Sequence, residues 1–169
     1  MDTIVNKVSQ SDLITLDLRD FLPKEERVSL DISPWLKQGI LLVEKEFREQ
    51  LKDFSFEPFK DKHVALHCST EAILPGWAFA LVSTYLVGVA KSVKVGSLLD
   101  VEESLIGANI LAHDFSVYQD KPIILKGCNT GIDPQNNYLL LIEKLYPVAR
   151  SIMYGEACST VPLYKKKAK

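Results

Sequence analysis

The sequence lacks the motifs that mark several common classes of protein. It has no Gly-x-Gly-x-x-Gly run and no Walker loop, so no glycine motif supports nucleotide binding. The start of the chain has no basic stretch followed by an apolar run, and we expect no secretory signal. An excess of charge is also missing, since 20 Lys and Arg against 22 Asp and Glu give a net charge of −2. This balance offers no electrostatic footprint for nucleic acid or an anionic membrane, and we expect neither as a partner.

Cysteine is scarce, with three residues in a chain of 169. An odd number without compact spacing argues against a disulfide framework and predicts a cytoplasmic location, where thiols stay reduced. Hydrophobic residues make up 47% and charged residues 25%, which is ordinary for a globular protein. The length predicts one α/β domain over residues 1–169.

Charged side chains are absent from Ala72 to Ala90, a stretch close to the length of a membrane span. The stretch contains Pro75, Gly76 and Gly88, and strand patterns lie on both sides of it. A helix buried against a parallel sheet has the same composition. We therefore predict a buried helix from about Leu74 to Val89 and no association with a membrane.

From about residue 58 onward, strand and helix patterns alternate. Strands are predicted at 63–67, 92–95, 122–126 and 149–154, and helices at 74–89, 98–112 and from Asp133 to about Tyr146. His63, at the start of the first strand, is expected at the surface. This order predicts repeated βα units over residues 58–160, forming a mostly parallel sheet with helices on both faces.

The first 55 residues have a different pattern. Leu13–Leu18 and Arg27–Ile32 alternate apolar and polar side chains, and the segment between them contains Pro23. This predicts an N-terminal antiparallel strand pair at one edge of the main sheet, followed by a helix over 41–52.

Two stretches of the chain resemble each other in residues and in order. Asp53-Phe54-Ser55-Phe56 recurs as Asp114-Phe115-Ser116-Val117, and each copy continues through a turn, a strand and a cysteine. A predicted helix precedes both copies. We interpret this as an internal repeat, with independent convergence of similar turn sequences as the alternative.

Each cysteine opens a similar tripeptide after a predicted strand. The three are Cys68-Ser69-Thr70, Cys128-Asn129-Thr130 and Cys158-Ser159-Thr160, separated by 60 and 30 residues. Ligands of open parallel sheets bind at the carboxyl ends of the strands, where helix N-termini favour a thiolate. We expect the three thiols to lie at this edge and to converge on one crevice.

Three functions fit such thiols. Three thiolates and a fourth donor would bind zinc or an iron–sulfur cluster, and the candidate fourth donors are His67, Glu71, Ser97 and Glu156. The alternatives are a thiol-dependent redox or persulfide-handling enzyme, and a structural or interaction protein with core cysteines. Phosphatase chemistry at His67-Cys68 is disfavoured, because Leu74 stands where that loop needs an arginine.

Three stretches resemble an uncharacterised bacterial family, the domain of unknown function 2480, which is found mainly in Bacteroidetes. They are 62–69, 126–128 and 151–165, and the last contains the specific Ser-Ile-Met-Tyr-Gly-Glu-Ala-Cys-Ser-Thr-Val-Pro segment. The resemblance covers the whole chain but supplies no catalytic residues. It implies an association with the SUF iron–sulfur assembly genes, and hence iron–sulfur assembly proteins as partners.

Overall fold

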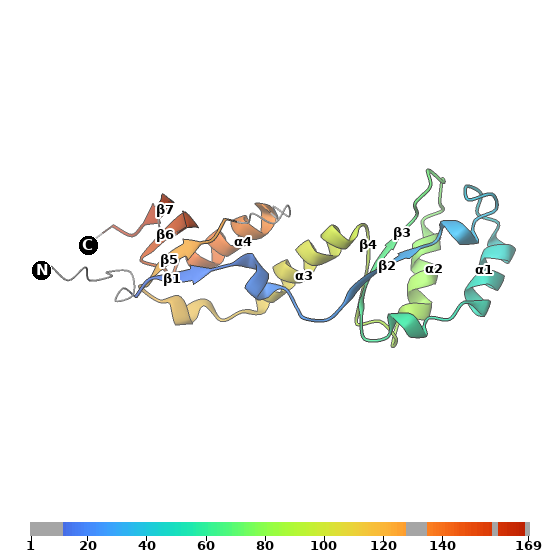
Figure 1. Cartoon of the computed structure of the whole chain (residues 1–169), viewed down its shortest axis with the longest axis horizontal. Coiled ribbons are helices and arrows are strands. Elements are labelled where there is room, and N and C mark those ends of the chain that lie inside the picture. The colour runs from blue at the N-terminus through green and yellow to red at the C-terminus, as the bar shows by residue number, and fades with distance from the viewer. Residues whose placement is uncertain (1–11, 128–134, 157–158, 168–169) are drawn as a thin grey trace, which may run out of the picture. The chain divides into compact units, whose positions relative to one another are not determined.

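The chain forms two compact units in a computed structural model that describes residues 12–127, 135–156 and 159–167. Unit 1 comprises Met1–Leu22 and Leu105–Lys169, and unit 2 comprises Pro23–Ser104 (Figure 1). Each unit has its own sheet and its own hydrophobic cluster. The expectation that the whole chain behaves as one domain stays a prediction.

Unit 2 is built on three parallel strands in the order β2-β3-β4. Its elements are β2 (Arg27–Asp31), the 3₁₀ helix η2 (Ser33–Trp35), α1 (Glu44–Asp53), η3 (Glu57–Phe59), β3 (His63–His67), α2 (Trp77–Leu86) and β4 (Ser92–Val95). The helix α2 is shorter than the predicted span at both ends, because Pro75 disfavours a helical conformation of the residue before it and Gly88 has a positive φ of 79°.

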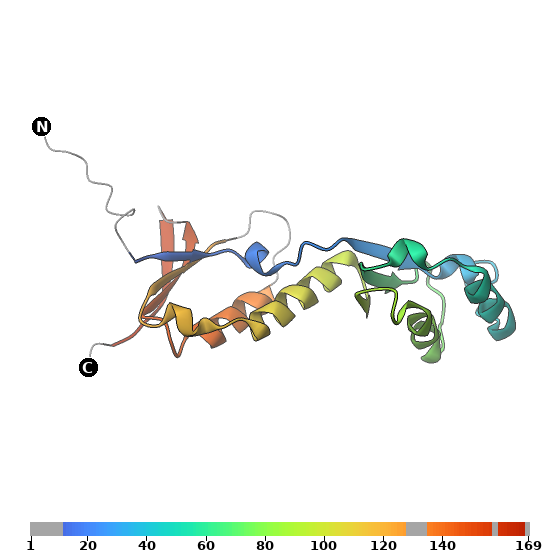
Figure 2. The ribbon, with the colours of Figure 1, turned by 90° about the horizontal axis from the view of Figure 1, so that it is seen from below.

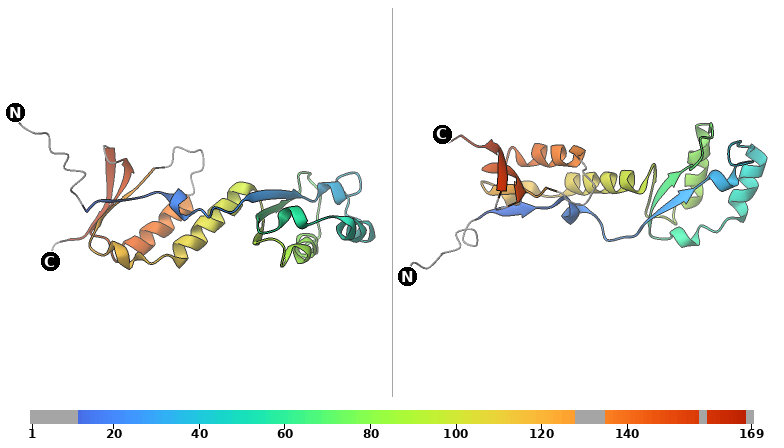
Figure 3. Two further views of the ribbon diagram at one scale, coloured as in Figure 1. Left: turned by 60° about the horizontal axis from the view of Figure 1, so that its bottom comes forward. Right: turned by 45° about the horizontal axis from the view of Figure 1, so that its top comes forward.

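Unit 1 has a mixed sheet in the order β1-β5-β6-β7. Its elements are β1 (Ile14–Leu16), η1 (Leu18–Phe21), α3 (Leu98–Ala112), η4 (Phe115–Tyr118), β5 (Pro122–Leu125), α4 (Gln135–Leu145), β6 (Ser151–Glu156) and β7 (Ser159–Lys165). The boundary between the units falls inside α3. β1, β5 and β6 are parallel, and β7 returns antiparallel beside β6 (Figure 3).

Two predictions about the sheet are wrong. The N-terminal strands do not form an antiparallel pair, because β1 pairs parallel with β5 while β2 pairs parallel with β3 in the other sheet. The described part of the chain therefore has two sheets where one was predicted. Alternation of apolar and polar residues identifies a half-buried strand but carries no information about its partner or direction.

Within the described residues, the helices that connect the parallel strands lie on one face of each sheet. In unit 2, Phe47 and Leu51 of α1 and Leu86 of α2 share one cluster with Val64 and Leu66 of β3 (Figure 2). α3 and α4 pack in the same way on the equivalent face of sheet A. Right-handed crossovers between parallel strands that follow one another in one direction all lie on one face, and helices reach both faces only where the strand order reverses.

Backbone geometry matches between the two copies of the repeat at a constant offset of 59 residues, whereas the stretches 53–56 and 114–117 compared in the sequence are 61 residues apart and are out of this register. Asp61 and Asp120 both have positive φ, 57° and 56°. Their N–H groups donate to equivalent carbonyls after the next helix, Val89 and Val148, each at 2.9 Å. The core positions match at the same offset, as in Leu51 and Ile110, both fully buried.

The repeat extends to the first strand of each unit, which the sequence comparison missed. Because Val28 pairs with Val64 and Ile14 pairs with Ile123, β1 and β2 hold equivalent places. An aspartate lies at the end of each strand, Asp17 just after β1 and Asp31 as the last residue of β2, and a short 3₁₀ helix comes next. Unit 2 is thus a second copy of the same arrangement, inserted into unit 1 after η1.

Candidate functional site

The predicted site residues divide between the two units. Cys68, His67 and Glu71 lie at or after the end of β3 in unit 2, and Glu156 is the last residue of β6 in unit 1. Cys128 and Cys158 lie outside the described residues. β3 belongs to a different sheet from β5 and β6, so the expectation that all three cysteines follow strands of one sheet is wrong for Cys68.

The thiol of Cys68 is part of a hydrogen-bonded chain between two loops. Its Sγ lies 3.2 Å from Oγ1 of Thr70, and that hydroxyl donates to the carbonyl of Gly39. A hydroxyl has one hydrogen to give, so the Cys68 thiol is the donor in its contact with Thr70. The residue is half-buried against the unit 2 core. In this arrangement Cys68 is a hydrogen-bonded packing residue.

The most strongly organised polar group at this edge is Asp31, the last residue of β2. Its Oδ1 accepts the backbone N–H groups of Ser33 (2.9 Å) and Ser69 (3.0 Å), and its Oδ2 accepts their two hydroxyls (2.8 and 2.6 Å). Burial raises the pKa of Asp31, but the hydrogen bonds from Ser69 and Ser33 outweigh it and bring the pKa well below its ordinary value. The carboxylate ties the end of β2 to the loop that follows β3.

Asp17 is the counterpart of Asp31 in unit 1. It caps η1 by accepting the N–H of Arg19 at 3.0 Å, and it pairs with the Arg19 guanidinium. The ammonium of Lys126, just after β5, lies 3.9 Å away. The hydrogen bond from the Arg19 side chain is the main cause of the lowered pKa of Asp17. Sequence reasoning missed both aspartates, although Leu-Asp after an alternating strand occurs at each place.

His63 is buried, so the expectation of a surface position is wrong. It is 4% exposed, and its Nδ1 lies 2.7 Å from the Ser92 hydroxyl of β4. Its Nε2 has no hydrogen-bond partner within the described part of the chain. Desolvation lowers the pKa of His63, which keeps the ring neutral. The burial of His63 follows from the place of β3 as the central strand of its sheet. The residues at 63–67 alone do not show that place.

The family described as "Protein of unknown function (DUF2480)" matches residues 2–166 of the chain. The chain belongs to this family. No curated protein and no solved structure matches the chain. The family carries no assigned activity, so the argument for function depends on the chain's own residues.

The repeat also changes how the cysteines of this DUF2480 protein compare. At the offset of 59 residues, Cys68 corresponds to Gly127, and Cys128 corresponds to Ser69. The first two cysteines are 60 residues apart, one more than the offset of the repeat. Because Cys128 lies outside the described residues, the prediction of thiols at equivalent strand ends stays a prediction for this pair.

No group of three His, Cys, Asp or Glu side chains that could bind a metal occurs among residues 12–127, 135–156 and 159–167. Glu71 and Glu156 are exposed. His67 follows Leu66 in β3 and projects to the opposite face from Leu66, since side chains alternate along a strand. The assignments of His67, Glu71 and Glu156 as metal ligands stay predictions. No helix in the described ranges is long and apolar enough to cross a membrane.

Proposed function

We propose that this protein is a binding protein in which Cys128 and Cys158 hold zinc or an iron–sulfur cluster. The supporting observation is that β5 and β6 are adjacent parallel strands, paired from Pro122 and Ser151 to Leu125 and Tyr154. Cys128 and Cys158 follow these two strands closely in the sequence. Thiolates that follow neighbouring parallel strands suit a soft metal, which needs sulfur ligands about 2.3 Å from the ion.

Cys68 has a separate role in this proposal. Its strand belongs to sheet B, and its thiol hydrogen is donated to Thr70. We assign it to packing, and the neighbouring His67 and Glu71 are then not ligands of the metal. Glu156 ends β6 two positions before Cys158 and is the preferred candidate for an additional donor. Accessory binding of this kind, with iron–sulfur assembly proteins as partners, is the function that the family resemblance also favours.

Anaerobic purification followed by elemental analysis and absorption spectroscopy tests the metal site. We expect stoichiometric zinc or iron in the unaltered protein, loss of the metal in Cys128→Ser and in Cys158→Ser, and its retention in Cys68→Ser. Cys68→Ser is the matched control, since it removes a thiol without touching the proposed pair. A metal-free protein, or equal loss in all three variants, would show the proposal to be wrong.

The reactivity of the cysteines distinguishes a thiol-dependent enzyme from a metal-binding protein. That function requires one cysteine to be a reactive thiolate at neutral pH, so its alkylation rate would stay high well below pH 8. Mapping alkylation of the metal-free protein by mass spectrometry between pH 5 and pH 9 measures this. A single cysteine modified rapidly at pH 6 would favour the enzyme over the binding protein.

An interaction protein is the second candidate, favoured by exposed apolar residues on two adjoining loops of unit 2. The Thr70 hydroxyl bonds the Gly39 carbonyl and so joins these loops. Ile40 and Leu41 beside Gly39 are 59% and 57% exposed, and Ile73 beyond Thr70 is 95% exposed. Such residues stand out on a folded surface. A variant with all three cysteines replaced would keep partner binding under this candidate and lose it under the first.

A further inference from the structure

The two copies of the repeat differ at one edge of the sheet. In sheet A the outer edge of β6 is covered by β7, which runs antiparallel to it. The equivalent strand of sheet B is β4, since Ile152 and Val93 pair with equivalent residues of β5 and β3. β4 is the last strand of sheet B, and in the part of the chain that the structure describes no strand lies beyond it. Unit 2 thus has the acceptor strand without its partner.

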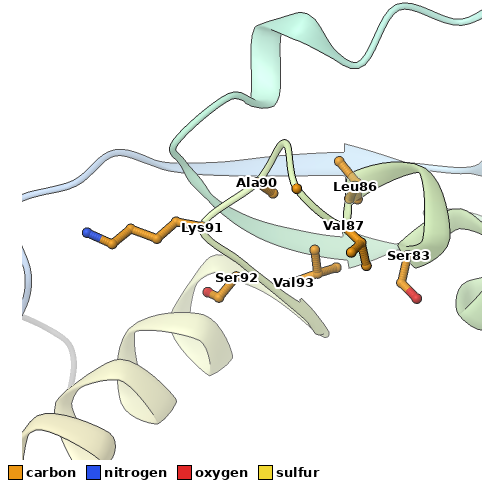
Figure 4. A pocket seen from close by; sticks show the side chains of 8 residues that line it. Ser83, Leu86, Val87, Ala90, Lys91, Ser92 and Val93 are labelled. Atoms are coloured by element: carbon orange, nitrogen blue, oxygen red, sulfur yellow. The ribbon is translucent and has the colours of Figure 1, made fainter.

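A hollow of about 410 Å³ lies beside β4, where the counterpart of β7 would pack. Figure 4 shows it between the end of α2 and β4, with Ser83 and Val87 from the helix side and Val93 from the strand. Val87 is 78% exposed, and Leu86 next to it is fully buried. The hollow therefore combines an apolar wall with an open sheet edge.

In unit 1 the same place is filled by β7. Val87 corresponds to Tyr146, whose ring packs on Tyr164 of β7 with centroids 4.4 Å apart. Tyr164 pairs with Ile152, the counterpart of Val93. Two residues after Tyr164, the N–H of Lys166 donates to the carbonyl of Arg150 at 2.9 Å, and Arg150 corresponds to Lys91. Val87, Lys91 and Val93, which line the hollow, are thus the counterparts of residues that hold β7.

The charges near the hollow also favour a strand placed as β7 is in unit 1. In unit 1 the ammonium of Lys166 lies 2.8 Å from Asp120. The counterpart of Asp120 is Asp61, which shares its positive φ and its backbone hydrogen bond. Asp61 is exposed, and its carboxylate has no ion-pair or hydrogen-bond partner among the described residues. An incoming strand with a basic residue after an aromatic one would give it a partner.

We propose that β4 is a docking site for an extended segment of a partner protein, added antiparallel to β4 as β7 is added to β6. The segment has an aromatic side chain for the hollow and a lysine or arginine two positions later for Asp61. Main-chain hydrogen bonds supply affinity and the two side chains supply selectivity, as in other strand-addition complexes. A second copy of this chain is not the occupant, because its β7 is already paired in its own sheet.

The probe is a labelled peptide, Ser-Thr-Val-Pro-Leu-Tyr-Lys-Lys, which repeats residues 159–166. Its binding to the whole protein is measured by fluorescence anisotropy, and amide hydrogen exchange is followed over Ser92–Val95. We expect saturable binding with protection of these amides. Val87→Glu, which places a charge in the hollow at an exposed position, should weaken binding at least tenfold. Asp61→Asn, which tolerates the positive φ, should weaken it a few-fold.

Val117→Glu is the matched control, because Val117 is 52% exposed in unit 1 and lies outside the hollow. Thermal unfolding confirms that each variant is folded. A peptide with the tyrosine replaced by alanine should bind at least tenfold more weakly. Absence of binding at 1 mM peptide, binding that Val87→Glu leaves unchanged because the peptide replaces β7, or a dimer paired through β4 would each overturn the proposal.

Discussion

Replacing Asp31 tests whether one carboxylate joins the first two strands of unit 2. The change Asp31→Ala removes the acceptor of four hydrogen bonds, two from backbone N–H groups and two from serine hydroxyls. The hydroxyls of Ser33 and Ser69 can turn to water or to each other, since their oxygens already lie 2.9 Å apart. The two backbone N–H groups cannot turn, so they account for most of the loss.

A hydrogen bond to a charged group contributes about 1.5 to 3 kcal/mol when it is shielded from water. Asp31 is only half-buried, so we take about 1.5 kcal/mol for each of the two backbone N–H groups. We therefore expect Asp31→Ala to reduce the free energy of unfolding by about 2 to 3 kcal/mol. Asp114 is the control, since it is exposed and accepts one backbone N–H, from Ser116 at 2.9 Å. Asp114→Ala should cause a clearly smaller loss. Urea unfolding followed by circular dichroism measures both.

The pH dependence gives a second readout. The pKa of Asp31 is lowered in the folded protein, so its stabilisation is complete above the pKa of an unfolded aspartate, about 3.9. It is lost as the pH falls below that value towards the folded pKa. The difference in stability between the unaltered protein and Asp31→Ala should therefore shrink between pH 5 and pH 2. A difference below about 0.5 kcal/mol at pH 7, or one that stays constant down to pH 2, would refute this reasoning.

Three further predictions concern the core, a glycine and a histidine. Leu51→Ala and its counterpart Ile110→Ala, both at fully buried positions, should each cost about 2 to 5 kcal/mol in urea unfolding. If the chain is one domain, both variants unfold in a single transition at a lower urea concentration. Two separate unfolding transitions would contradict that. Gly155→Ala should cost about 2 kcal/mol or more in thermal unfolding, because φ is 125° and a Cβ would lie 2.5 Å from the Ser159 carbonyl oxygen. Gly76→Ala, where nothing lies within 4 Å, should be close to neutral, and equal effects would show the argument to be wrong. The lowered pKa of His63 means that stability falls as the pH drops through the pKa of an unfolded histidine, about 6.5, and His63→Gln should flatten this fall between pH 7.5 and pH 5. An unchanged slope would exclude His63 as its source.

The local elements could be predicted from the sequence, and the pairing of strands could not. The predicted strands 63–67 and 92–95 and the helix 98–112 have the observed limits, because apolar runs there are bounded by turn residues. The partner of residues 14–16 is β5, more than 100 residues away. Alternation at 14–16 only shows that one face is buried, and the fold is decided by which sheet that face joins.

The candidate site was predicted less well than the fold. The ends of the strands do carry organised polar residues. In the described chain these are Asp31 in sheet B and Asp17 beside sheet A, and neither was singled out. Cysteines are easy to notice because they are rare. The pattern of a strand, an aspartate and a 3₁₀ helix occurs twice within the first 36 residues. Because it is made of common residues, its structural role is recognised only when the two units are compared.

The insertion of unit 2 after η1 determines the order in which the protein can fold during synthesis. Residues 23–104 form a compact unit with its own sheet, so all the strands of sheet B have left the ribosome and can pair before β5 is made. β1 is made first but finds its partner β5 only after residue 125 has emerged. Meanwhile the folded insert shortens the flexible chain between β1 and the rest of its sheet, which lowers the entropy cost of closing that loop. Translation past β5 is thus the point at which the earliest strand can leave its exposed state.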